Sequence, residues 1–349
     1  MRLKLDPIYA VAKSFGIKGQ LLPYSYLEEL AESRSVDEFV DKLRITPYGQ
    51  HLTDLKKPYD QLAIEKALRR HVIDVHHRLV NVTPRAELLS VYFYRYVASD
   101  MKAVLRAKAM GRGFEEIQQG LDLYAEELLG VRDEVVRAAA AASLEEAVEE
   151  LRRTFLAPDA SLAYRIWEER RDLSALDSAV SKAFYTKLLK AFKKTPRGGR
   201  GDLKEFIALE VDGYQILTLL RAKTWGLPAP QTRELLLDEQ VNLTRDFIDD
   251  AVEAEDIGEV VKMLANTPYR RLVAGGAEGL AVISSLEEAF KKELYRKAGK
   301  LYKAKPFSMA ITIATVLLKE LEARNLTAIA IGLVEGLRPS VIAQSLWRV

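Results

Sequence analysis

The feature that most constrains this chain is internal repetition at a period of about 110 residues, the size of a small domain. Three short segments align without a gap, and they are residues 35–46, 143–154 and 256–267. Each begins with serine or aspartate, which can cap a helix, and has glutamate three positions later, which is capping-box spacing. Valine and leucine follow three residues apart, at Val40 and Leu43 in the first copy, on one helix face. The chain therefore repeats one amphipathic helix three times.

A second motif repeats in the same order, at residues 100–111, 215–226 and 325–336. Each copy opens with a polar residue able to hydrogen-bond a neighbouring helix, and each closes on glycine, which permits a left-handed C-terminal turn. Because both motifs return the same spacing, the sequence predicts an all-α protein of three tandem, structurally similar helical bundles. The predicted units are residues 5–112, 113–228 and 229–349.

Composition narrows the functional classes. Lys plus Arg number 52 and Asp plus Glu 50, so the net charge of +2 gives no general attraction to nucleic acid. The chain has no cysteine, which excludes disulfides and thiol chemistry. The longest apolar stretch, residues 308–318, is about half the ~20 residues that a membrane-spanning helix needs. Any membrane role is therefore expected to be peripheral.

Several segments together have the pattern of a known family. The strongest is residues 305–307 followed by residues 317–339, which contain the third copy of the second motif. Further segments with this pattern are Leu21-Leu22 with Tyr24, residues 46–48, residues 102–108 and residues 219–223. On these segments, in this order, the chain resembles the C subunit of archaeal-type ATP synthases, a family related to the d subunit of the eukaryotic vacuolar ATPase.

This resemblance implies both a fold and a role. The three bundles would surround a pseudo-threefold axis and form a funnel. Its wide side would lie on the ring of proteolipid subunits, at the cytoplasmic face of the membrane, and its cavity would receive a shaft of D and F subunits. The chain would be a non-catalytic, peripheral central-stalk adaptor that transmits torque for ion-coupled ATP synthesis or hydrolysis. It would need no cofactor, metal or small-molecule substrate. An unrelated all-helical scaffold would explain the repeats, but not the family pattern of the third copy.

Basic residues close to the ends of the second motif are the candidate shaft contacts. They are Arg106, Lys108, Arg221 and Lys223. Alternatively, these cations complement the negative C-terminal ends of their own helices. The third copy has Ile331 and Leu333 at the corresponding places, so the socket is expected to be lopsided.

Two groups of polar residues raise the question of chemistry. The first is His71, Asp74, His76 and His77, for which a solvated helix face is favoured over a metal site, because the histidines diverge around a helix. The second is Asp249, Asp250 and Glu253, which resemble the magnesium-diphosphate motif of isoprenoid synthases, an all-helical enzyme class. Acidic residues continue directly after this motif, so a plain acidic helix end is the favoured interpretation.

Three further segments have simple structural interpretations. Residues 196–201 are rich in glycine and arginine and predict a flexible basic loop, because they lack the lysine and serine or threonine of a phosphate loop. Lysines and arginines between residues 291 and 305 predict a solvated face, with contact to acidic headgroups or the shaft as the alternative. The aromatic residues at positions 92–96 are expected in the core.

Overall fold

The computed structural model describes residues 6–273 and 279–348, and in these ranges the chain is helical without any strand. This confirms the all-α prediction. The chain divides into two compact units, unit 1 (Met1–Phe93 with Tyr295–Val349) and unit 2 (Tyr94–Leu294). Both cuts fall inside long helices and not at the repeat boundaries, so the division into three bundles stays a prediction. Within the described ranges, none of the helices combines the length and apolar composition needed to cross a bilayer.

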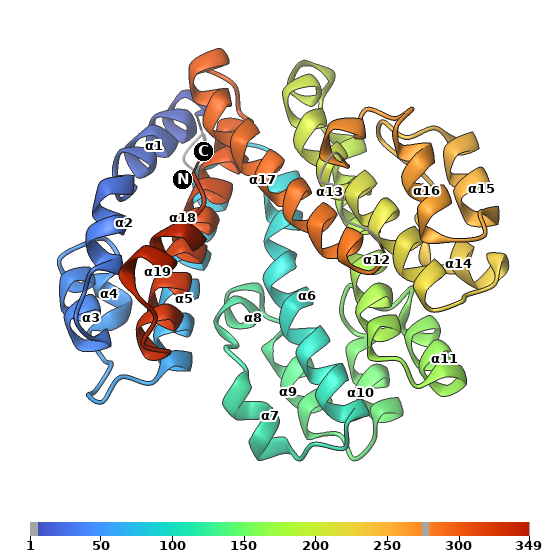
Figure 1. Ribbon diagram of the computed structural model, residues 1–349, viewed down its shortest axis with the longest axis horizontal. Helices are drawn as coiled ribbons and strands as arrows, with labels where there is room; N and C mark the ends of the chain where they lie inside the picture. Colours follow the sequence, from blue (N-terminus) through green and yellow to red (C-terminus); the bar gives the residue numbers. More distant parts are fainter. Residues whose placement is uncertain (1–5, 274–278, 349) are drawn as a thin grey trace, which may run out of the picture. The chain divides into compact units, whose positions relative to one another are not determined.

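Unit 1 joins the two ends of the chain. Its helices are α1 (Pro7–Gly19), α2 (Tyr24–Ala31), α3 (Val36–Arg44), α4 (Gly49–Leu52), α5 (Gln61–Val82), α18 (Ile311–Val334) and α19 (Pro339–Ser345), with the first residues of α6 (Glu87–Ala109) and the last of α17 (Ala281–Ala304). Helix α18 packs against α1, α2, α3, α5 and α19. Figure 1 shows this red C-terminal helix among the blue N-terminal ones. Because other helices cover α18 over most of its length, it is apolar around most of its circumference.

Unit 2 holds the middle of the chain. Besides its parts of α6 and α17, it contains α7 (Phe114–Gly120), α8 (Tyr124–Leu129), α9 (Arg132–Ala140), α10 (Leu144–Leu151), α11 (Ala160–Arg170), α12 (Leu173–Lys194), α13 (Arg197–Thr224), α14 (Ala229–Leu235), α15 (Arg245–Glu253), α16 (Ile257–Leu264) and the 3-10 turn η1 (Arg270–Leu272). Helix α13 packs against α12, α14 and α16, as α18 packs against several helices of unit 1.

The repeated helix starts have the predicted geometry. The side chains of Ser35, Ser143 and Asp256 each accept a hydrogen bond from the backbone N–H three residues later, at the first turn of α3, α10 and α16. In each copy the glutamate reaches back and accepts from the residue before the cap, at 3.0, 2.9 and 2.8 Å. The capping-box prediction is therefore confirmed in all three copies.

The ends of these helices share a threonine, whereas only two of them are followed by proline. The sequence predicts that Pro47 and Pro268 stop α3 and α16, and both helices do end shortly before these prolines. Helix α10 ends at the corresponding place with no proline after it, so proline is not required. In all three copies a threonine hydroxyl donates to the carbonyl three residues back and accepts from the N–H two residues on. The hydroxyls of the repeated Thr46, Thr154 and Thr267 thus add a second hydrogen bond to a last-turn carbonyl that also accepts from the threonine's own backbone N–H.

The glycines that close the second motif also behave as predicted. Gly111, Gly226 and Gly336 have φ of 73°, 61° and 65°, the left-handed region that glycine enters without steric cost. In each copy the N–H after the glycine bonds the carbonyl five residues back, at 2.9, 2.9 and 2.8 Å. This is the Schellman pattern, and it ends α6, α13 and α18 identically.

One loop prediction is wrong. Residues 197–201 are the first turn of α13, and Pro196 is the residue before it. Arg200 folds back so that its guanidinium donates to the carbonyl of Thr195 at 2.8 Å and to that of Lys193. These bonds serve carbonyls at the end of α12, where helical partners are missing. The glycines therefore join a helix although each costs about 1 kcal/mol relative to alanine.

Candidate functional site

Each unit contains a buried tyrosine–carboxylate pair, formed by residues that lie close in sequence to the repeated motifs. In unit 1 the Tyr48 hydroxyl donates to Glu322 Oε2 at 2.8 Å, and Lys319 Nζ lies 2.7 Å from the same oxygen. The backbone N–H of Leu22 donates to the other carboxylate oxygen. Lys319 and Glu322 are 1% and 4% exposed, so this is a buried ion pair with its remaining oxygen satisfied. It ties α1, α3, α4 and α18 together.

Unit 2 has the corresponding pair with a different partner set. The Tyr269 hydroxyl donates to Asp212 Oδ2 at 2.6 Å, and Asp212 also accepts from the backbone N–H groups of Val241, Asn242 and Leu243. Burial raises the pKa of Asp212, and these hydrogen bonds oppose that shift. Asp212 and Glu322 both stand three residues before the second motif, and Tyr48 and Tyr269 both stand two residues after the capping threonine.

The polar residue that opens the second motif holds a distant backbone segment. Asn325 donates through its amide nitrogen to the carbonyl of Trp347 at 2.9 Å and accepts from the N–H of Trp347 at 2.9 Å. Gln215 does the same with Leu237, at 3.1 and 3.0 Å. The sequence predicts a bond to a neighbouring helix, and that is wrong for both: each clamp instead fastens the non-helical residues that follow a short helix, α14 or α19.

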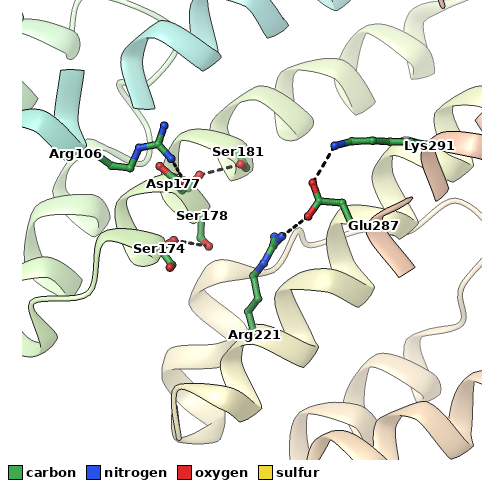
Figure 2. Close-up of polar contacts among 8 residues, drawn as sticks. All are labelled: Arg106, Ser174, Asp177, Ser178, Ser181, Arg221, Glu287 and Lys291. Atoms are coloured by element: carbon green, nitrogen blue, oxygen red, sulfur yellow. Dashed lines mark hydrogen bonds and ion pairs between the residues drawn. The ribbon is translucent and has the colours of Figure 1, made fainter. Parts of the chain in front are cut away.

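The candidate shaft residues Arg106 and Arg221 form equivalent ion pairs in unit 2. Arg106 lies 3.1 Å from Asp177 of α12, and Arg221 lies 3.0 Å from Glu287 of α17 (Figure 2). Both arginines remain partly exposed, at 44% and 34% of their side chains. Exposed pairs of this kind contribute little stability, about 0–1 kcal/mol.

A third cation joins these pairs into one charged cluster. Burial lowers the pKa of Lys102, and the charges of both Arg106 and Arg221 lower it further, against the attraction of Asp177 and Glu287. The two arginines and the two carboxylates therefore all lie within electrostatic range of Lys102. Lys102 and the two carboxylates are not among the candidates chosen from the sequence. A usable signal exists for the carboxylates, because Asp177 and Glu287 are separated by the repeat period.

The two carboxylates of this cluster differ in environment. Burial raises the pKa of Asp177 above that of a free aspartate, and the three nearby cations only reduce that shift. Burial also acts to raise the pKa of Glu287, but the hydrogen bond and charge of Lys291, with the charge of Arg221, outweigh it and lower the pKa. Figure 2 shows Lys291 and Arg221 on opposite sides of the Glu287 carboxylate.

Lys108 and Lys223 cap neighbouring helices. Lys108 Nζ donates to the carbonyl of Ala141 at the end of α9, and Lys223 Nζ donates to that of Val252 in the last turn of α15, both at 2.6 Å. A cation at a helix C-terminus is favourable there. The alternative interpretation from the sequence is that these cations complement the C-terminal ends of their own helices. The two lysines do bond helix C-terminal carbonyls, but those carbonyls belong to neighbouring helices.

The third copy of the motif lacks these polar contacts, as its sequence indicates. Leu333 packs on the apolar core that joins α2, α3, α5 and α18, and Ile331 is 37% exposed. Val334 and Leu337 are exposed as well, so this helix end presents an apolar surface. The second motif therefore ends in basic residues on α6 and α13 and in an apolar surface on α18.

The groups considered for catalysis have structural roles. His71 and His76 are 2% and 0% exposed, so the expectation of a solvated helix face is wrong for them, because α5 packs against α1, α4 and α18 together. Arg233 forms ion pairs with Asp249 and Glu253. In the described part of the chain, no three His, Cys, Asp or Glu side chains are arranged to hold a metal ion.

The aromatic residues at positions 92–96 and the basic residues between 291 and 305 each fall into two groups with different surroundings. Tyr92, Phe93 and Tyr96 are buried, which confirms the core prediction for them, and Tyr94 is half-buried. Lys291 and Lys292 pair with glutamates one turn earlier on α17. Cations nearer the end of α17 instead line a cavity in unit 1.

These features define an all-helical protein with repeated capped helices and buried clamps. Residues 10–345 match the model of the ATP synthase (C/AC39) subunit family, so the chain belongs to that family. It is similar to the C subunit of the A-type ATP synthase of Methanocaldococcus jannaschii, with 26% identity over 96% of this chain and 84% of the relative. The C subunits of Thermococcus gammatolerans and Pyrococcus abyssi are each 27% identical over 96% of this chain, and 88% and 89% of the relatives are covered.

Proposed function

We propose that this chain is the C subunit of an A-type ATP synthase, acting as the non-catalytic central-stalk adaptor of a rotary enzyme. It links the shaft of D and F subunits to the proteolipid ring at the cytoplasmic face of the membrane and passes torque between them. The observation that carries this proposal is the family match along almost the whole chain. The buried clamps at Glu322 and Asp212 support it, because a torque-bearing part needs helices that cannot slide past one another.

The shaft contact is proposed at the charged cluster of unit 2. Lys102, Arg106, Arg221 and Lys291 surround two carboxylates there, which leaves an excess of two positive charges for an acidic partner. Lys108 and Lys223 are assigned an indirect part, because their ammonium groups already hold α9 and α15. Charges at the rim of an interface act mainly on association rate and orientation.

Binding kinetics of the purified D–F shaft to the full chain test this proposal. The double variant Arg106→Gln/Arg221→Gln removes two charges without placing a carboxylate beside Glu287. We expect its association rate at low salt to fall about tenfold and its salt dependence to weaken. The matched control is Arg132→Gln/Lys262→Gln, which removes two exposed charges elsewhere in unit 2.

Two results would contradict these assignments separately. If the shaft binds both variants and the wild type at the same rate at every salt concentration, the cluster is not the contact. If the wild type binds neither the shaft nor proteolipid rings in nanodiscs, the adaptor role itself fails.

A further inference from the structure

Unit 1 contains a cavity of about 530 Å³. It lies between the link from α1 to α2, the last turns of α17, the middle of α18 and the residues after α19. Its volume is in the range of small-molecule sites, which is about 300–1,000 Å³. Its apolar lining includes five leucines and two aromatic residues, which are Leu21, Leu22, Leu27, Leu318, Leu321, Tyr24 and Trp347.

Positive charge surrounds this apolar lining. The cations that line the cavity are Lys18, Arg296, Lys300, Lys303 and Arg348. Arg296, Lys300 and Lys303 are exposed and recur at helical spacing, so they follow one face of α17. One carboxylate, Glu322, is also in the lining, and its charge is met by Lys319 at 2.7 Å. The lining therefore carries more cations than carboxylates, and of these cations Arg348 also pairs with Glu28 outside the lining, at 2.9 Å.

The buried polar side chains of the lining are already committed. Glu322 accepts from Tyr48, Leu22 and Lys319, and the Asn325 amide uses both its oxygen and its nitrogen on the Trp347 backbone. A peptide in this cavity would bury amide groups that need hydrogen-bond partners, and each amide left unpaired would weaken its binding. An alkyl chain has no such requirement.

We propose that this cavity binds a single-chain anionic amphiphile, with its alkyl chain against the leucines and its carboxylate or phosphate head against the cations of α17. Burial of the alkyl chain supplies most of the affinity, because every CH₂ group removed from water contributes favourably. The cations select the charge of the head. Trp347, whose backbone is held by Asn325, and Arg348, which pairs with Glu28, also line the site.

Calorimetric titration of the detergent-free full chain tests the proposal with dodecyl phosphate, kept below its aggregation concentration. Inorganic phosphate represents the head alone, and dodecyl maltoside represents the chain with a neutral head. We expect one dodecyl phosphate per chain, bound at least tenfold more tightly than either comparison compound. The variants Lys300→Glu/Lys303→Glu and Gly299→Leu should each weaken binding at least tenfold, the first through charge and the second by filling the cavity.

The control Lys56→Glu/Lys262→Glu changes the net charge equally at two exposed lysines outside the cavity, and it should bind like the wild type. Gly299→Leu raises helix propensity, so it remains a valid test if the lysine variant does not fold. Equal binding by wild type and Gly299→Leu would overturn the proposal. So would equal affinity for dodecyl phosphate and dodecyl maltoside, or for dodecyl phosphate and inorganic phosphate. Tighter binding of a capped peptide of alternating leucine and glutamate would assign the cavity to a partner protein instead.

Discussion

Glu322 in unit 1 and Asp212 in unit 2 occupy the same place in the repeat and accept from equivalent tyrosines, yet their charges are balanced differently. Glu322 lies against the ammonium of Lys319, while Asp212 receives three backbone N–H groups. The tyrosines also rest on different rings. Tyr48 packs on His71 with centroids 4.1 Å apart, and Tyr269 packs on Phe290 at 5.3 Å.

This difference shows that the repeat preserves a geometry and not a set of interactions. The desolvation cost of a buried carboxylate must be offset, and either a cation or several backbone N–H donors can offset it. Unit 1 therefore depends on two ionisable side chains where unit 2 depends on one. The substitutions below separate these two solutions.

The largest effect is expected at the carboxylates. Glu322→Gln leaves the buried Lys319 charge without its partner and should lower the free energy of unfolding of unit 1 by about 3–5 kcal/mol. Asp212→Asn keeps one acceptor oxygen and leaves no buried cation, so unit 2 should lose about 1–3 kcal/mol. Urea unfolding, with hydrogen exchange read separately for each unit by mass spectrometry, measures both.

The double variant Lys319→Met/Glu322→Gln serves as the control for this prediction. It removes both charges and should recover most of the loss caused by Glu322→Gln. A greater loss from Asp212→Asn than from Glu322→Gln would show that the ammonium contributes nothing distinctive.

A smaller effect is expected from pH. Burial first, then the charge of Lys319, lowers the pKa of His71 to about 3, while the unfolded chain has the ordinary value near 6.5. The unfolded state therefore binds the proton first, and unit 1 loses stability as the pH falls from about 6.5 toward 3. At pH 5 this loss amounts to about 2 kcal/mol.

His71→Phe should remove that part of the pH dependence, since phenylalanine does not titrate and both ring nitrogens of His71 are buried without hydrogen-bond partners. Amide exchange of unit 1 at pH 7 and pH 5 reports the change, with unit 2 in the same sample as the internal reference. An unchanged difference between the two pH values would show that His71 is not the titrating group.

The smallest effect is expected at the helix ends. Arg221→Gln removes a partly exposed ion pair and should cost no more than about 1 kcal/mol. Ile331→Arg gives the third copy the missing guanidinium on α18, which packs against α5. There Glu65 stands five residues after the capping Asp60, as Asp177 stands five after Asp172. The substitution should stabilise unit 1 by up to about 0.5 kcal/mol, compared with Ile331→Gln, in thermal unfolding. If Ile331→Arg lowers the stability of unit 1, the packing of Ile331 contributes more than the new ion pair does.

Part of this structure could be predicted from the sequence alone. The all-helical class, the three capping boxes and the three left-handed glycines all follow from residues within about five positions of one another. The family resemblance also followed from short segments, among them the copies of the second motif. Local hydrogen bonds depend on local sequence, so a repeated pattern predicts a repeated geometry.

The tertiary structure decided which distant residues complete each motif. Nothing in the sequence around Tyr48 points to Glu322, 274 residues later, or shows that Lys319 is buried. The burial of His71 likewise depends on helices that are distant in the sequence. The physical reason is that burial and charge compensation are set by what packs against a residue, and a buried carboxylate can be satisfied by whichever donors the fold brings to it.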